Sequence, residues 1–205
     1  MRIRGLYAIT DPALLPPARL LAAVADAIAG GASIIQYRNK AASPSRQREE
    51  ARQLCALCRD NGVLFLVNDD LALAEDCAAH GVHLGQQDGD IAQARARLGD
   101  AAIIGRTCHD SLPLALAAQQ AGASYVAFGR FFPSFTKPQA SAADITLLPQ
   151  ARAALRIPIV AIGGVTVDNA PQLLGAGADA VAVIHDLFAA EDIRARARQF
   201  AALFR

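Results

Sequence analysis

The sequence predicts a single α/β domain folded as a (β/α)8 barrel, and three observations support this fold class. Short apolar runs alternate with amphipathic, alanine-rich stretches, and eight such pairs follow one another along the chain. Several alanine-rich stretches stop at a glycine, as in "AIAGGAS", "RDNGV" and "LGAGAD", which is how helices commonly end. No G-x-G-x-x-G follows the first apolar run, which argues against the competing fold, an open doubly wound sheet.

The elements can be assigned in order along the chain. The expected strands are "IRGLYAIT", "SIIQYR", "LFLVN", "GVHL", "AIIGRT", "YVAFG", "IPIVAIGG" and "AVAVIH". The expected helices cover 16–29, 43–61, 70–79, 90–98, 111–121, 141–155, 168–176 and 188–204. Because no linker or low-complexity stretch interrupts this pattern, residues 1–205 are expected to form one domain.

Composition limits the classes of partner. The chain has 205 residues, 53% of them apolar, yet no apolar run reaches the length of a membrane span. The start, "MRIRGLYAIT", enters a strand pattern at once and does not resemble a signal peptide, so a cytoplasmic location is expected. A net charge of +1 and 5% aromatic residues, with no Trp, predict neither a nucleic-acid nor a membrane partner.

The four cysteines are expected to be ordinary buried or half-buried thiols in a reducing compartment. "LCALC" contains a C-x-x-C, but it lies within a helical pattern and no second C-x-x-C follows, so zinc is poorly supported. The cysteines are Cys55, Cys58, Cys77 and Cys108.

Polar residues gather where the expected strands end. In a barrel of this kind these positions line one mouth, which is where active sites are found. They are Gln36, Arg38, Lys40, Asn68, Asp69, His83, Gln86, Asp88, Thr107, His109, Ser134, Thr136, Lys137, Gly163 and Gly164.

The cations among them predict an anion site. The chain contains only two lysines, Lys40 and Lys137, and both lie in loops that follow strands. In "SIIQYRNK", Gln36, Arg38 and Lys40 share a face if the extended geometry continues through Lys40. Cations placed side by side need a shared anion, and Arg and Lys suit a phosphate.

The carboxylates of "NDD" and "GQQDGD" follow neighbouring strands. Asp69 and Asp88 lie nearer the strand ends and are the candidate ligands for Mg²⁺, which takes one or two carboxylates together with substrate oxygens. Asp70 and Asp90 are expected to be helix N-caps.

The glycine pair in "AIGGVTVDNA" lies where a strand turns into a helix. Backbone N–H groups there can bind a second phosphate, and the loops after strands seven and eight of barrels commonly do so. A plain turn stays open as the alternative reading of Gly163 and Gly164.

A family resemblance now becomes visible. "GLYAITD", "IIQYRNK", "VNDD", "GVHLGQQD", "IIGRTCH", "FGRFFPSFTKP", "AIGGVTVDN" and "AVAVIH", in this order, closely resemble the thiamine phosphate synthase family. The resemblance runs from about Gly5 to Phe188. It implies a TIM-barrel transferase that joins 4-amino-5-hydroxymethyl-2-methylpyrimidine diphosphate to 4-methyl-5-(2-phosphoethyl)thiazole with Mg²⁺, giving thiamine phosphate and diphosphate.

The resemblance also implies a role for each matching residue. Pyrimidine contacts fall on Tyr7, Gln36 and His83. The implied diphosphate-binding residues are Arg38, Lys40, Asn68, Thr107 and Lys137. All of these except Asn68 are also the implied catalytic residues. The Mg²⁺ ligands fall on Asp69 and Asp88. The implied binding site for the thiazole phosphate consists of Ser134, Thr136, Gly163, Gly164 and the backbone of Ile184 and His185.

The implied reaction is dissociative, because the pyrimidine methylene departs as a carbocation before the thiazole nitrogen attacks. Such a step needs stabilisation of charge on the leaving diphosphate and no strong base. The chain departs from the family at four positions, with Ser134 for threonine or asparagine, Thr107 for serine, Asp70 for arginine and His185 for serine. If the serine hydroxyl matters at position 185, the affinity for thiazole phosphate is affected.

Two alternatives stay open. A thiazole tautomerase of the same ancestry could use His109 for proton transfer, although packing or capping within its loop is the simpler role for this histidine. A non-catalytic regulator that binds a phosphorylated ligand would need neither the carboxylate pair nor a second anion site. The last helical stretch, "EDIRARARQFAALFR", suits packing on the barrel, and homo-oligomer formation is left undecided by the sequence.

Overall fold

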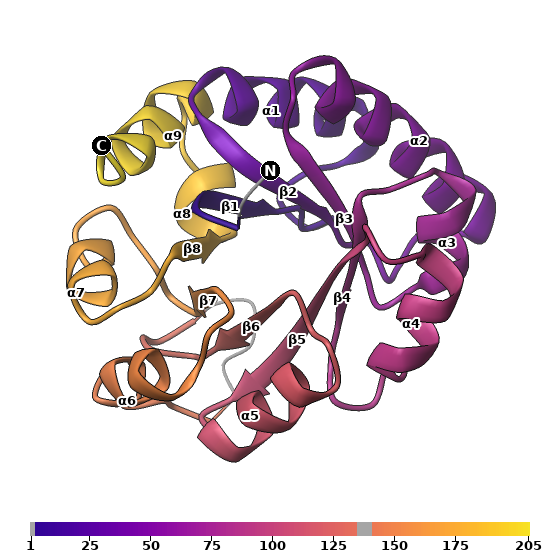
Figure 1. Ribbon diagram of the computed structural model, residues 1–205. Helices are drawn as coiled ribbons and strands as arrows, with labels where there is room; N and C mark the ends of the chain where they lie inside the picture. The colour runs from indigo at the N-terminus through magenta and orange to yellow at the C-terminus, as the bar shows by residue number, and fades with distance from the viewer. Residues whose placement is uncertain (1–2, 135–140) are drawn as a thin grey trace.

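The structure is a computed structural model that describes residues 3–134 and 141–205, and its eight parallel strands close into a barrel in chain order (Figure 1). The strands are β1 Gly5–Ile9, β2 Ala32–Tyr37, β3 Leu64–Asn68, β4 Gly81–Leu84, β5 Ile103–His109, β6 Tyr125–Phe128, β7 Ile159–Ile162 and β8 Ala180–Val183. Strand β1 pairs with both β2 and β8, which closes the barrel. The predicted fold class is confirmed.

Helices form a ring around the strands (Figure 1). They are α1 Pro17–Ala29, α2 Pro44–Asp60, α3 Leu71–Asp76, α4 Ile91–Leu98, α5 Leu112–Gln120, α6 Leu147–Ala154, α7 Ala170–Gly175, α8 His185–Phe188 and α9 Ile193–Ala202. All of them except α8 lie within the predicted stretches.

Helices α6 and α9 begin later than predicted. Helix α6 begins only at Leu147, because Ser141 and Ala143 are hydrogen-bonded through their backbones to Arg130 and cannot be helical. The last stretch is shorter than 188–204, because Asp192 accepts a hydrogen bond from Ala195 N at 2.8 Å and starts α9 there. A short additional helix, α8, directly follows β8.

Apolar side chains fill both sides of the sheet. Inside the barrel, Ile34, Leu66 and Val160 belong to one buried cluster, whereas Ile35 and Phe65 face outwards and pack with the helices in another. Because both faces of every strand are covered, the strands appear in the sequence as continuous apolar runs.

A large aromatic side chain crosses the barrel interior because a glycine faces it. Tyr125 is fully buried on β6, and a Cβ at Gly105 on β5 would lie 2.1 Å from its Cζ. Only glycine at position 105 leaves room for this ring, which carries its hydroxyl to the centre of the site described below.

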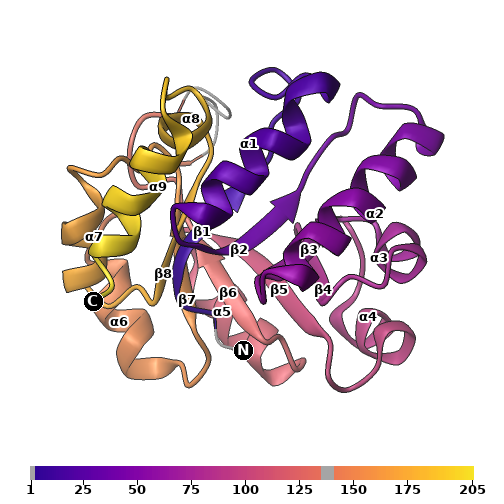
Figure 2. The same ribbon diagram turned by 90° about the horizontal axis from the view of Figure 1, so that it is seen from above.

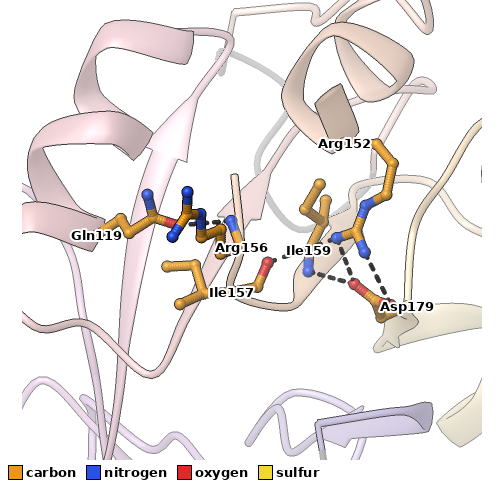
Figure 3. A network of polar contacts seen from close by, with 6 residues as sticks. All are labelled: Gln119, Arg152, Arg156, Ile157, Ile159 and Asp179. Carbon is orange, nitrogen blue, oxygen red and sulfur yellow. Dashed lines mark hydrogen bonds and ion pairs between the residues drawn. The ribbon is translucent and has the colours of Figure 1, made fainter. Parts of the chain in front are cut away.

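The turns at the N-terminal ends of the strands are joined by polar contacts (Figure 3). Asp179 accepts hydrogen bonds from Arg152 Nη2 and from Ile159 N, both at 2.8 Å. Gln119 Oε1 accepts a hydrogen bond from Arg156 N at 2.7 Å. Figure 2 shows α8 at the opposite end of the barrel, near the mouth.

All four cysteines are buried and none forms a disulfide, so the predicted buried thiols are confirmed. Burial raises the pKa of Cys58, Cys77 and Cys108 to about 12, so each of these thiols stays protonated at neutral pH. Over 3–134 and 141–205, no helix has the length and apolar character that crossing a bilayer requires.

Candidate active site

A chain of hydrogen bonds crosses the inside of the barrel at its mouth. Gln36 Nε2 donates to Tyr7 Oη at 2.5 Å, and the hydroxyls of Tyr7 and Tyr125 lie 2.8 Å apart. His83 Nδ1 lies 2.8 Å from the Tyr125 hydroxyl, and His83 Nε2 lies 2.8 Å from Thr107 Oγ1. The inward side chains of five strands are thus joined into one polar chain, which we call the mouth relay.

Burial sets the charge state of the mouth relay. Tyr7, Gln36, His83 and Tyr125 are all buried. Burial raises the pKa of both Tyr7 and Tyr125 well above that of an exposed tyrosine, so both phenols remain neutral. Their hydroxyls can therefore both donate hydrogen bonds to, and accept them from, an uncharged polar ring of a bound ligand.

The loop after β2 carries the predicted cations, but its geometry differs from the conditional prediction. Strand β2 ends at Tyr37, so the extended register does not continue through Lys40. The chain turns there because Asn39 Oδ1 accepts hydrogen bonds from the backbone N–H groups of Ala41 and Ala42. Arg38 is half-buried, and Lys40 is exposed.

Lys40 nevertheless reaches the acidic residues of the neighbouring loop. Its Nζ lies 2.7 Å from Asp69 Oδ2, which also accepts a hydrogen bond from Asn68 Nδ2 at 2.6 Å. The other oxygen, Asp69 Oδ1, accepts from Gly85 N at 3.3 Å. Partial burial alone would raise the pKa of the Asp69 carboxyl, but the Lys40 ammonium and these N–H groups hold that pKa below its ordinary value.

The two candidate metal ligands border one small space. A Cβ at Gly85 would lie 2.3 Å from Asp88 Oδ2 and 4.0 Å from Asp69 Oδ1. A side chain at position 85 would fill the space that both carboxylates face. Two carboxylates with room for waters and substrate oxygens fit Mg²⁺, which is rarely caged by protein alone. In the described ranges no cluster of three or more His, Cys, Asp or Glu side chains offers a metal site.

The glycine pair after β7 lies against the loop after β6. Phe132 N donates to Gly163 O at 3.0 Å, and a Cβ at Gly164 would lie 2.2 Å from Pro133 O. Both glycines have positive φ, +100° and +63°, which favours glycine. The contact brings Ser134, the residue after Pro133, close to the pair.

The remaining predicted residues fall into three groups. Ile184 packs against the cluster inside the barrel, and His185 is exposed at the start of α8. Thr136 and Lys137 lie outside the described residues. His109 is exposed, so its side chain is not part of the core, and its carbonyl accepts a hydrogen bond from Gly129 N at 2.9 Å. Packing or capping within its loop stays a prediction for this side chain.

The expected helix caps are confirmed. Asp70 accepts a hydrogen bond from Leu73 N at 2.9 Å at the start of α3. Asp90 accepts from Ala92 N at 2.6 Å and from Gln93 N at 3.2 Å at the start of α4. Both carboxylates are committed to these helices, which separates them from Asp69 and Asp88.

Sequence reasoning missed two residues of this site. Tyr125 connects the two halves of the mouth relay, and Gly105, which makes room for its ring, faces it only in the folded structure, so no signal in the sequence pointed to Tyr125. Thr10, directly after β1, is buried, and its hydroxyl accepts from Arg38 N at 2.9 Å. A polar residue at the end of the first strand was its only signal.

Comparisons with known proteins agree with one another. Residues 6–187 match the family model described as thiamine monophosphate synthase. The chain is 55% identical to a thiamine-phosphate synthase of Alcanivorax borkumensis, over 99% of this chain and 95% of the relative. It is 54% identical to one of Thioalkalivibrio sulfidiphilus, over 99% and 96% of the two chains. A solved thiamine phosphate pyrophosphorylase from Pyrococcus furiosus has a TM-score of 0.87 at 35% identity, covering 98% of this chain and 95% of the other.

Proposed function

The chain belongs to the thiamine monophosphate synthase family, and from this membership we propose how its barrel mouth carries out the family's reaction. The enzyme is a transferase. It joins 4-amino-5-hydroxymethyl-2-methylpyrimidine diphosphate to 4-methyl-5-(2-phosphoethyl)thiazole and releases diphosphate and thiamine phosphate. One observation carries the proposal for the site: the mouth relay, the Lys40–Asp69 pair and the space between Asp69 and Asp88 all occur at one end of the barrel.

The mouth relay suits the pyrimidine. Gln36, Tyr7 and His83 present neutral donors and acceptors in a buried setting, which matches the ring nitrogens and the amino group of an uncharged heterocycle. Their role is to orient the ring so that its methylene carbon faces the second substrate. Neutral phenols also avoid placing a negative charge where a good hydrogen-bond donor is needed.

The cations and donors beside the mouth relay suit the diphosphate. In the proposal, Arg38, Lys40, Asn68, Thr107 and Lys137 hold its oxygens. Mg²⁺, when bound by Asp69 and Asp88, supplies further positive charge to these oxygens. Asp69 presents Oδ1 towards Asp88 and Oδ2 towards Lys40, so it can serve the metal while it holds the lysine in place.

The thiazole phosphate is assigned to the opposite part of the mouth. Ser134, Thr136, Gly163 and Gly164 would bind it together with the backbone of Ile184 and His185. The contact between the loop after β6 and the glycine pair supports this grouping. Loops after the seventh and eighth strands of barrels bind phosphate because their backbone N–H groups point into the mouth.

The bond changes balance without an added base. The bond between the methylene carbon and the diphosphate oxygen breaks, and its electron pair leaves with the diphosphate. The thiazole nitrogen then donates its lone pair to the methylene carbon and forms the new C–N bond. No proton has to be removed, so the task of Arg38, Lys40, Thr107 and Lys137 is to stabilise charge on the leaving group.

The experiment that tests this function measures diphosphate release from purified protein with Mg²⁺ and each substrate alone or both together. We expect diphosphate and thiamine phosphate to form in equal amounts, and only when both substrates are present. A thiazole tautomerase would change its thiazole substrate without a pyrimidine, and a regulator would bind ligand without turnover. The proposal keeps the expectation of a cytoplasmic enzyme with no nucleic-acid or membrane partner.

A further inference from the structure

A buried carboxylate lies outside the barrel, behind the loop that follows β2. Glu50 on α2 is only 7% exposed, and its Oε2 accepts hydrogen bonds from Tyr37 Oη at 2.7 Å and Asn39 Nδ2 at 3.0 Å. Tyr37 and Asn39 are the residues on either side of Arg38. One carboxylate oxygen therefore binds both neighbours of a proposed diphosphate ligand.

Asn39 also forms hydrogen bonds with the backbone that follows it in the loop and with α2. Asn39 Oδ1 accepts hydrogen bonds from Ala41 N at 3.3 Å and Ala42 N at 3.2 Å. Its carbonyl accepts from Gln47 Nε2, also on α2, at 2.7 Å. The orientation that Glu50 imposes on Asn39 is thus passed to the backbone on both sides of Lys40.

The opposite side of the loop is held from the barrel. Thr10 Oγ1 accepts from Arg38 N at 2.9 Å and lies 3.3 Å from Arg38 O, where its hydroxyl can donate. The backbone of Arg38 is therefore fixed by Thr10, while the side chains before and after it are fixed by Glu50. Tyr37 and Asn39 face α2, and Lys40 reaches Asp69 at the mouth.

Packing alone does not explain a carboxylate at this position. Among the described residues, no group forms a hydrogen bond with the second oxygen, Glu50 Oε1, although that oxygen is buried. An apolar side chain of similar size would fill the same space without burying a carboxylate. What Glu50 adds is an acceptor that orients two donors.

We propose that Glu50 is a positioning residue for the diphosphate loop, residues 37–42. Its carboxylate fixes the side chains of Tyr37 and Asn39. Because Arg38 and Lys40 alternate with these two residues, they are then held in position to contact the leaving group. The inference rests on the proposed function, in which Arg38 and Lys40 bind diphosphate. It adds a residue on the outer helix layer that never touches the substrate.

Binding of inorganic pyrophosphate with Mg²⁺, measured by isothermal titration calorimetry, tests this role in the full-length protein. The variants are Glu50→Ala, which removes the acceptor, and Glu50→Gln, whose amide oxygen can still accept both hydrogen bonds. Leu54→Ala is the matched control, because Leu54 is buried one turn further along α2 and contacts the core rather than the loop. Tyr37→Phe keeps the packing and removes one donor, so it provides the measurement if Glu50→Ala does not fold.

We expect Glu50→Ala to raise the Kd for magnesium pyrophosphate about tenfold, because the two cations are no longer pre-positioned. Tyr37→Phe should weaken binding by a smaller factor. Glu50→Gln and Leu54→Ala should stay within about twofold of the original protein, although Leu54→Ala lowers the melting temperature. In steady-state assays the KM for the pyrimidine diphosphate should rise in Glu50→Ala, whereas the KM for the thiazole phosphate should not.

Two further variants separate this inference from the function on which it rests. Arg38→Ala and Lys40→Ala should each weaken pyrophosphate binding. If they do and Glu50→Ala binds as the original protein does, the positioning role is wrong and the proposed function stands. If neither changes the Kd, the proposed diphosphate site is wrong, and the inference fails with it. Equal losses in Glu50→Gln and Glu50→Ala would mean that the charge matters, which would overturn the geometric account.

Discussion

The hydroxyl oxygens of Tyr7 and Tyr125 lie 2.8 Å apart inside the barrel, and every other member of the mouth relay is joined through this pair. Tyr125 stacks beside His83, with ring centroids 5.6 Å apart and an interplanar angle of 25°. The Tyr125 hydroxyl therefore links Tyr7, which is bonded to Gln36, with His83, which is bonded to Thr107.

Tyr125→Phe should separate the two halves of the mouth relay without emptying the space that the ring fills. The hydroxyl of Tyr7 and the Nδ1 of His83 each lose a partner, which costs about 1–2 kcal/mol of folding free energy. We expect kcat/KM for the pyrimidine diphosphate to fall about tenfold, because the pyrimidine ring of the substrate is less well oriented. Urea unfolding and steady-state kinetics measure the two effects, and an unchanged kcat/KM would show that the tyrosine is only structural.

Gly85→Ala should disturb the proposed Mg²⁺ site while leaving the barrel intact. The new Cβ would lie 2.3 Å from Asp88 Oδ2, so the carboxylate must swing away from the space that it shares with Asp69. We expect the Mg²⁺ concentration for half-maximal activity to rise about tenfold. Gly175→Ala is the matched control, because no atom lies within 4 Å of a Cβ at that position.

Asp88→Ala tests the same Mg²⁺ site by removing one of the two side chains proposed to bind the metal. If Asp88 binds the metal, its removal should abolish activity or weaken the response to Mg²⁺ more than Gly85→Ala does. The measurement is a Mg²⁺ titration of diphosphate release at saturating concentrations of both substrates. A titration curve that matches the original protein would remove Asp88 from the set of metal ligands.

The fold could be read from the sequence because each strand and helix leaves a local signal. Apolar runs, alternating helical stretches and terminal glycines are local patterns, and eight repeats of them determine the topology of a barrel. The start of α6 could not be read, because the hydrogen bonds of Ser141 and Ala143 with Arg130 join two separate segments and form only when the chain folds, so they leave no local pattern in the sequence.

The site was only partly readable for a similar reason. Polar residues at strand ends, such as Asp69 and Asp88, stand out against an apolar background. Tyr125 does not, because a strand buried on both faces gives no periodicity that tells the inside of the barrel from the outside. Glu50 left a weak signal, since it lies four residues before the buried Leu54 and eight before the buried Cys58, on one face of α2.

Lys137→Ala tests a residue that lies outside the described residues, so that its role rests on the sequence. If Lys137 stabilises the leaving diphosphate, kcat should fall roughly 10²–10³-fold, about 3–4 kcal/mol, as it does when an oxyanion donor is removed. The KM for the thiazole phosphate should change little. Rapid-quench measurement of a single turnover separates this chemical effect from product release, and near-normal turnover would contradict the assignment.

His80 should make the folding free energy depend on pH. Burial, followed by the charge of Arg59, lowers the pKa of the His80 imidazole, whose Nδ1 accepts a hydrogen bond from Phe65 N at 3.0 Å. In the unfolded chain this histidine titrates near its ordinary pKa of about 6.5. As the pH falls below that value, the unfolded state takes up the proton first, so stability decreases towards the lower pKa of the folded state.

The measurement is urea unfolding of the original protein and of His80→Asn at several pH values between about 7.5 and about 5, from roughly one unit above to one and a half units below the ordinary histidine pKa. Asparagine can accept the Phe65 N–H with its side-chain oxygen and cannot titrate. We expect the variant to lose less stability than the original protein over this interval. Parallel curves for the two proteins would show that another group causes the pH dependence.

Asp179→Ala should lower stability without lowering kcat, because Asp179 directly precedes β8 and so lies at the N-terminal end of the barrel, away from the mouth. The ion pair with Arg152 is partly exposed, with 44% of the arginine and 31% of the aspartate side chain accessible. Such a pair contributes at most about 1 kcal/mol. The larger loss comes from Ile159 N, which donates to Asp179 at 2.8 Å and is left without this acceptor, at about 1–3 kcal/mol.

Arg152→Ala separates these two contributions, because it removes the ion pair and leaves the acceptor of Ile159 N in place. We expect Arg152→Ala to cost no more than about 1 kcal/mol and Asp179→Ala to cost roughly 2 kcal/mol, both measured by urea unfolding. Added salt should shrink the effect of Arg152→Ala, because it screens an exposed pair. It should leave most of the effect of Asp179→Ala, because a lost backbone hydrogen bond is not screened. Equal costs for the two variants would mean that the ion pair, rather than the backbone contact, holds the two turns together.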